Sequence, residues 1–236
     1  GLVIATGYAG ESESLLNFSP TFVWIIWWVG MSIFIALIGN IWALVNPWKI
    51  IFGWAEWFYQ IVRPGRGLSL SWNYPAKFGI WPALMLFVLY TWIQDAYTKG
   101  DIPSQIATMA VVYSIITLGG MFIFGRYQWL RHGEAFSVVF GVLSRFSVTE
   151  IRVKSQDSCP VCSVDCRNIS GECIDCYECF QRSSDRELNL RPFAIGLGRN
   201  EKVKNDILAL VVLMLSTVTF DGFSATPAWA KFQTFI

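Results

Sequence analysis

Four stretches of the chain are apolar over lengths that suit helices crossing a bilayer. A hydrocarbon core of about 30 Å needs roughly 20 apolar residues in a helix. The stretches are residues 21–45, 78–93, 106–124 and 207–220. Asn46-Pro47 ends the first stretch, because proline cannot donate a backbone hydrogen bond into a continuing helix. The pattern therefore predicts four transmembrane helices, of which the last is the shortest.

Two further segments mix large apolar side chains with polar ones and predict helices outside the spans. Residues 47–62 follow Asn46, a favourable N-cap, and place Pro47 at the first helical position. Residues 134–147 are more apolar, but their charge-free run is too short to span. Both segments are typical of helices that lie in the membrane interface. Helices packed on the bundle fit the same pattern.

Composition and charge support a membrane protein and give it an orientation. The chain is 54% hydrophobic and 15% charged, whereas about a quarter of the residues in soluble domains are charged. Its net charge of +1 gives no reason to expect nucleic acid as a partner. Four Lys and Arg lie between the first two spans and twelve between the last two. Since cytoplasmic loops concentrate Lys and Arg, we expect the N-terminus outside and both long loops in the cytoplasm.

All six cysteines lie between the third and fourth spans, in two clusters. Their spacing is Cys-x2-Cys-x3-Cys, followed by Cys-x2-Cys-x2-Cys. Each close pair points two thiolates at one ion, and two pairs complete a tetrahedral zinc site. We expect structural zinc, because all-thiolate sites leave no open position for catalysis. The expected metal ligands are Cys159, Cys162, Cys166, Cys173, Cys176 and Cys179.

Other states of the cysteines fit the same spacing. The second cluster resembles the first three ligands of a ferredoxin-type iron–sulfur cluster, and six thiolates could also share two zinc ions. Three disulfides are a further alternative, for which six cysteines allow fifteen pairings. A cytoplasmic loop is normally kept reduced, which favours a metal over disulfides.

These elements predict an all-α integral membrane protein with four transmembrane helices, interfacial helices and a small cysteine-rich metal-binding loop. The expected regions are an outer segment (1–20), three spans with the interfacial helix 47–62 (21–125), a cytoplasmic region with the interfacial helix 134–147 and the metal loop 155–183 (126–205), and the fourth span with an outer segment (206–236).

The chain offers few residues for catalysis. Its single histidine, His132, argues against bis-histidine haem, histidine copper centres and a Ser-His-Asp triad. Asp221 ends the fourth apolar run, and we expect it to be hydrated at the outer interface rather than functional. The tryptophans between Trp24 and Trp57 are typical of an aromatic belt or of helix contacts, and we prefer the belt.

Six phrases of the sequence carry a resemblance to a known family. They are residues 18–24 (FSPTFVW), 41–48 (IWALVNPW), 134–146 (EAFSVVFGVLSRF), 173–180 (CIDCYECF), 188–194 (LNLRPFA) and 216–230 (STVTFDGFSATPAWA). The phrases resemble a family of bacterial polytopic membrane proteins of unknown function, some of which carry the label fenitrothion hydrolase-like. The resemblance runs through nearly the whole chain. It implies a polytopic fold in the bacterial inner (cytoplasmic) membrane and a chain that is part of a longer protein. From the label alone it implies organophosphate hydrolysis, and it assigns no catalytic residue.

Together these patterns favour a non-catalytic subunit over an enzyme. We expect an integral membrane subunit of a larger complex, whose cysteine cluster braces the loop or docks a partner. Its expected partners are the lipid bilayer and other membrane protein subunits. The alternative is an electron-transfer subunit with an iron–sulfur cluster. A membrane transporter or hydrolase comes third, because neither repeats nor several midplane charges are evident.

Overall fold

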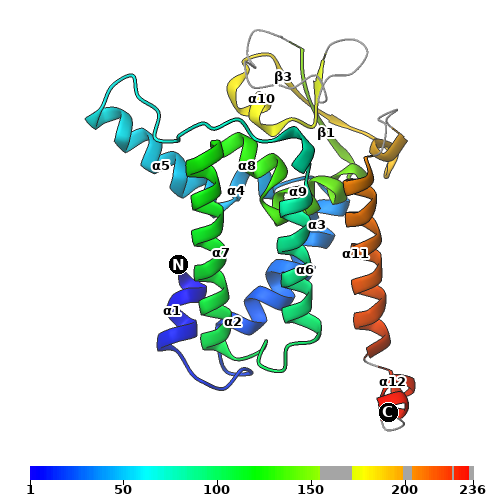
Figure 1. Cartoon of the computed structure of the whole chain (residues 1–236). Coiled ribbons are helices and arrows are strands. Elements are labelled where there is room, and N and C mark those ends of the chain that lie inside the picture. The colour runs from blue at the N-terminus through cyan, green and yellow to red at the C-terminus, as the bar shows by residue number, and fades with distance from the viewer. Residues whose placement is uncertain (155–171, 199–203, 225, 234–236) are drawn as a thin grey trace.

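The computed structural model describes residues 1–154, 172–198, 204–224 and 226–233, and it is mostly helical (Figure 1). Four of its helices are long and apolar enough to cross a membrane. They are Phe18–Leu37, Ala76–Asp95, Pro103–Phe124 and Asn205–Ser224. The prediction of four helices able to cross a membrane is therefore confirmed, and the fourth is longer than expected.

The first span ends earlier than the apolar pattern predicts. It consists of α2 (Phe18–Pro20), the π-helix η1 (Thr21–Gly30) and α3 (Met31–Leu37). The chain then turns at Asn40, whose Oδ1 accepts a hydrogen bond from the Ala43 backbone N–H at 3.2 Å. This contact starts a separate short helix, α4 (Trp42–Val45). The predicted helix 21–45 is thus broken, because the Asn40 side chain competes for backbone hydrogen bonds.

The other spans lie beside one another and are joined to shorter helices. The 3-10 turn η2 (Ala76–Phe78) leads into α6 (Trp81–Asp95), and α7 (Pro103–Phe124) follows it. The last span is α11 (Asn205–Ser224), which is followed by α12 (Pro227–Gln233). The N-terminal helix α1 (Leu2–Ala9) packs on the first turns of α7, where a Cβ on Gly7 would lie 2.6 Å from the Ala107 Cβ.

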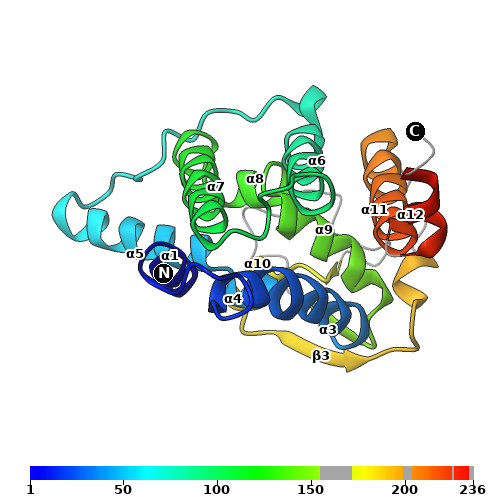
Figure 2. The same ribbon diagram turned by 90° about the horizontal axis from the view of Figure 1, so that it is seen from below.

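Three more helices gather at one end of the bundle. They are α5 (Pro47–Val62), α8 (Arg126–His132) and α9 (Ala135–Leu143), and the 3-10 turn η3 (Ser144–Phe146) follows α9. As predicted, Asn46 caps α5: its Oδ1 accepts from the backbone N–H groups of Trp48 at 3.0 Å and Lys49 at 3.1 Å. Seen along the bundle, α5 extends sideways from it (Figure 2).

A small sheet covers the same end of the bundle. Its strands are β1 (Thr149–Val153), β2 (Cys173–Ile174) and β3 (Arg186–Leu190), in the antiparallel order β2-β1-β3. The helix α10 (Tyr177–Arg182) packs against β1, and the turn η5 (Ile195–Gly198) follows β3. We call β1, β2, α10 and β3 the cap. The all-helical expectation is wrong here, because Ile151 and Val153 of β1 bury alternate β-branched side chains, which favours a strand.

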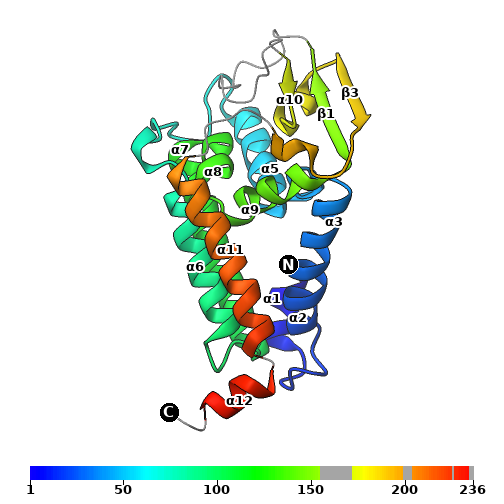
Figure 3. The same ribbon diagram turned by 90° about the vertical axis from the view of Figure 1, so that its right-hand side faces the viewer.

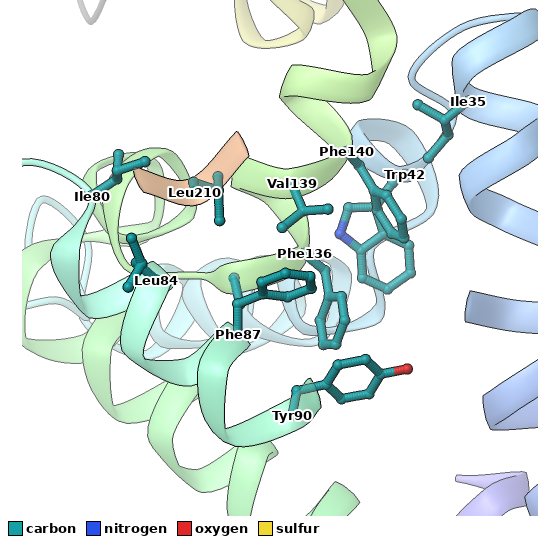
Figure 4. Packing of buried hydrophobic residues seen from close by; sticks show 11 residues of the cluster. Ile35, Trp42, Ile80, Leu84, Phe87, Tyr90, Phe136, Val139, Phe140 and Leu210 are labelled. Atoms are coloured by element: carbon teal, nitrogen blue, oxygen red, sulfur yellow. The ribbon is translucent and has the colours of Figure 1, made fainter. Parts of the chain in front are cut away.

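The main core lies between the spans and α9 (Figure 4). Trp27 and Trp28 point into this core, with ring centroids 4.4 and 6.2 Å from that of Phe136. Trp54 and Trp57 of α5 are instead 68% and 65% exposed. The expected tryptophan belt is therefore wrong for the first group, which makes helix contacts. The buried residues of the core are Ile35, Trp42, Ile80, Leu84, Phe87, Tyr90, Ala135, Phe136, Val139, Phe140 and Leu210.

The chain direction alternates from span to span, so that both long connections lie at the cap end (Figures 1 and 3). The helices α3 and α7 run toward the cap, whereas α6 and α11 run away from it. The segments between the first two spans and between the last two therefore share one end. This arrangement gathers at one end the two segments in which most Lys and Arg occur.

Candidate functional site

The structure places half of the predicted metal ligands in the cap. Cys173 lies on β2, Cys176 immediately precedes α10, and Cys179 lies within α10. The three side chains form a small apolar cluster with Val153 and Phe180. The other expected ligands, Cys159, Cys162 and Cys166, lie outside the described residues.

The turn between Cys173 and Cys176 is fixed by a buried arginine. Asp175 in this turn has a φ of +54°, a left-handed conformation that Asp tolerates better than most residues. Its Oδ2 accepts a hydrogen bond from the Arg191 Nη1 at 2.8 Å. Since Arg191 is only 8% exposed, the cysteine turn is held from the inside of the cap.

The same arginine ties the cysteine turn to the end of α9. Its Nε donates to the Ser147 carbonyl oxygen at 3.0 Å, and its Nη2 donates to the Ser144 carbonyl oxygen at 2.9 Å. Its Nη1 also lies 3.4 Å from the Glu150 Oε2. A buried guanidinium needs such partners to offset the loss of its hydration. Arg191 therefore joins the cysteine turn, the sheet and the bundle in one network.

The cysteine side chains differ in their surroundings. The backbone N–H groups of Cys179 and Glu178 hydrogen bond to the Cys176 thiol, and burial raises the pKa of this thiol above its ordinary value despite these bonds. Such N–H groups stabilise a thiolate, which is the form that binds a metal. Cys173 and Cys176 carry reduced thiols. Cys179, by contrast, is disulfide-bonded, which is one of the alternatives that the spacing left open.

The described residues do not by themselves form a metal site. Within them, no group of three or more His, Cys, Asp and Glu side chains is arranged to hold an ion. Two reduced thiols, Cys173 and Cys176, suit a partial site, because a tetrahedral zinc needs four ligands. The predicted metal is therefore not confirmed.

The face of α10 opposite the cysteine cluster is fixed to the bundle. The Lys49 Nζ lies 2.7 Å from the Glu178 Oε1 and donates to the Gln181 Oε1 at 3.0 Å and to the Ala43 carbonyl oxygen at 2.8 Å. Lys49 is only 8% exposed. This one ammonium group thus joins α10 to the start of α5.

A second contact joins α10 to the end of the first span. The Tyr177 hydroxyl accepts a hydrogen bond from the Asn40 backbone N–H at 3.0 Å. Burial raises the pKa of Tyr177 to about 12, so its hydroxyl stays protonated at neutral pH. Asn40 follows α3 and Lys49 lies at the start of α5. Both ends of the segment that joins these helices are therefore fixed to α10, which carries Cys179.

A buried carboxylate lies beneath the cap, where α4, α7 and α9 meet. Glu134 has no exposed surface and caps α9, with its two oxygens accepting from the backbone N–H groups of Phe136 at 3.1 Å and Ser137 at 2.7 Å. Its other donors are the Tyr113 hydroxyl and, at 3.4 Å, the Asn46 Nδ2. These four donors satisfy both oxygens of the buried side chain. This network joins Asn46 to Glu134, two residues that are far apart in the sequence.

The remaining ionisable candidates take ordinary positions. The His132 ring stacks on Tyr74 at 5.0 Å, and its Nδ1 lies 3.1 Å from the Gln128 carbonyl oxygen of the same helix. Asp221 is exposed on α11, which continues beyond it to Ser224. Neither residue belongs to a described cluster of possible metal ligands.

Sequence reasoning missed Lys49, Glu134, Asp175 and Arg191 as functional candidates. Apart from the backbone N–H groups that Glu134 caps, most of their partners are many residues away, so local spacing does not reveal the contacts. The one local signal was the Asn46-Pro47 helix start, which correctly predicted a cap but not its neighbour Glu134.

Comparisons with protein families, with curated proteins and with solved structures find no match for the chain. The family resemblance of the sequence therefore stays an expectation.

Proposed function

We propose that the protein is an integral membrane subunit of a larger complex and that its cap docks another subunit. The attachment of α10 supports this role. Tyr177 and Glu178 contact the bundle, while Cys176 and Cys179 pack toward the sheet. A module held on two sides presents its outer surface in a defined orientation, which lowers the entropy cost of binding.

The observation that carries the docking proposal is the outer strand of the sheet. Since the strand order is β2-β1-β3, one side of β3 has no described neighbour strand. Leu188 and Leu190 on this strand are 66% and 83% exposed. Large apolar side chains on an unpaired edge are unfavourable in water and favour pairing with another chain. The patch continues along the chain through Phe193, Ile195 and Leu197.

A partner can occupy this edge by adding a strand. Its backbone would pair with the free side of β3, and its apolar side chains would cover Leu188 and Leu190. Asn189 lies between the two leucines and points to the opposite face of the strand, because successive side chains alternate. Position 189 therefore serves as a control for position 190 on the same strand.

Site-specific photo-cross-linking in native membranes tests the docking role. A photoreactive residue at position 190 should form a discrete adduct with another polypeptide, whereas the same residue at position 189 should form at least several-fold less. Adducts of equal yield at both positions, or adducts with lipid alone at position 190, would contradict docking through β3.

We further propose that a structural zinc ion stabilises the cap. A disulfide at Cys179 takes two of the six cysteines, and the four that remain suit one tetrahedral site. Cys173 and Cys176 supply two thiolates, and the other two come from the first cluster. The N–H groups directed at Cys176 support this assignment. Zinc here contributes folding free energy and no redox chemistry.

The disulfide at Cys179 favours a second candidate, a cap stabilised by disulfides alone. Stable disulfides are typical of oxidising compartments, whereas the distribution of Lys and Arg favours a cytoplasmic cap in the bacterial inner membrane. Metal analysis of the purified protein distinguishes the candidates. About one zinc per chain supports the first, and no metal supports the second. Iron with inorganic sulfide, in a brown sample, would instead support the electron-transfer subunit.

A further inference from the structure

Two arginines from different parts of the chain converge on one tyrosine. The Arg126 Nη2 donates to the Tyr127 hydroxyl at 2.8 Å, and the Arg182 Nη2 donates to the same oxygen. Their guanidinium carbons lie 4.9 and 4.5 Å from the centre of the Tyr127 ring. Arg126 and Tyr127 begin α8, whereas Arg182 ends α10. The pair therefore lies where the cap meets the bundle.

The positive charge of this pair is only partly neutralised. Within the described residues the ion pair of this cluster is with Glu56, whose Oε2 lies 3.2 Å from the Arg126 Nη1. Burial raises the pKa of Glu56 more than the two arginines lower it. The Arg126 Nε is buried without a described hydrogen-bond partner, and Arg182 is exposed. Two guanidiniums and one carboxylate leave a net positive charge.

The arginine pair adjoins a helix with a large uncovered apolar face. The α5 residues Trp54, Trp57 and Phe58 are 68%, 65% and 64% exposed. Glu56, which reaches Arg126, lies on the same helix, and α5 extends sideways from the spans (Figure 2). Exposed tryptophans beside cationic groups are typical of the level where lipid headgroups meet acyl chains. Trp54, Trp57 and Phe58 are three and four residues apart or adjacent, so they share one exposed face of α5.

We propose that Arg126, Arg182 and Tyr127 bind the phosphate of an anionic phospholipid. Guanidinium groups bind phosphate through paired, charge-assisted hydrogen bonds. The net positive charge selects an anionic headgroup over a zwitterionic one. Since Arg182 belongs to the cap and Arg126 to the bundle, one bound lipid contacts both. This site is independent of the docking role of β3.

Lipid binding to the delipidated, detergent-solubilised full chain tests the site. Native mass spectrometry with phosphatidylglycerol and with phosphatidylcholine gives the two affinities. In Arg182→Gln the phosphatidylglycerol affinity should fall about tenfold, which is the loss expected for one charge-assisted hydrogen bond. The phosphatidylcholine affinity should start weaker, because the choline cation opposes the net positive charge of the site, and it should fall less than the phosphatidylglycerol affinity. Tyr127→Phe, which keeps the ring but removes the shared hydroxyl, should weaken phosphatidylglycerol binding several-fold.

The matched control is Arg186→Gln. Arg186 also lies in the cap and stacks on an aromatic ring, with its guanidinium carbon 5.4 Å from the Phe180 centroid. Its substitution should leave phosphatidylglycerol binding unchanged. Equal losses in both arginine variants would show unspecific charge attraction and overturn the site, as would wild-type affinity in Arg182→Gln. Inorganic phosphate that displaces phosphatidylglycerol at equal concentration would overturn the assignment to a lipid.

Discussion

At the residue scale, single buried polar groups hold together segments that are far apart in the sequence. Lys49, Glu134 and Arg191 each make several charge-assisted contacts while almost fully buried. Removing one member of such a network takes one partner from each of the others in a site of low dielectric, which costs more than the contact itself contributes. Their substitution therefore gives large and local effects.

Lys49→Met should release α10 from the bundle without unfolding the sheet. The ammonium contacts with Glu178 and Gln181 disappear, and we expect a loss of about 2 kcal/mol, since Glu178 is partly exposed and its charge is screened. Amide hydrogen exchange should rise at residues 177–182 and stay slow in β1 and β3. Lys77→Met, at an exposed lysine, should change neither region. Unchanged exchange in Lys49→Met would contradict the proposed attachment.

Glu134→Gln should destabilise the bundle. Glutamine keeps the shape of the side chain but replaces one accepting oxygen by a donor, which opposes the backbone N–H groups of α9. We expect a loss of about 1–3 kcal/mol in the free energy of unfolding, measured by chemical denaturation in detergent. The control Glu187→Gln lies on the cap surface. A loss in Glu134→Gln as small as in this control would refute the role of the buried carboxylate.

At the element scale, the sequence predicted helices well where local signals decide them. The start of α5 at Pro47 and the positions of the second and third spans follow from apolar runs and caps. The break after Leu37 was missed, because apolar content alone does not report the competing Asn40 side chain. The sheet was missed because β1 is five residues long and its partner strands are distant in sequence.

All three strands of the cap should lose stability together when Arg191 is replaced. In Arg191→Met, Asp175 and Glu150 lose their shared cation, and the breaking of such a buried pair costs about 3–5 kcal/mol. Hydrogen exchange should therefore become fast throughout β1, β2 and β3 but stay slow in the spans. Arg186→Met, at an exposed position of β3, should keep the sheet protected. Equal protection in both variants would contradict this account.

At the scale of the whole molecule, four spans place both long connections at one end, and the cap covers that end. The apolar pattern and the positions of Lys and Arg predicted that both long connections lie at the same end. The pattern did not predict how the cap attaches, because Lys49, Tyr177 and Arg191 act across distances that only the fold brings together. It also left the state of the cysteines open.

The state of the cysteines is the central claim, and intact-mass spectrometry of the purified chain tests it most directly. We predict one bound zinc and one disulfide per chain. Before chelation, alkylation should modify none of the four remaining cysteines. After chelation it should modify all four, and exchange at residues 173–182 should become fast. A zinc-free chain whose thiols react without a chelator, or a chain with three disulfides, would contradict the proposal.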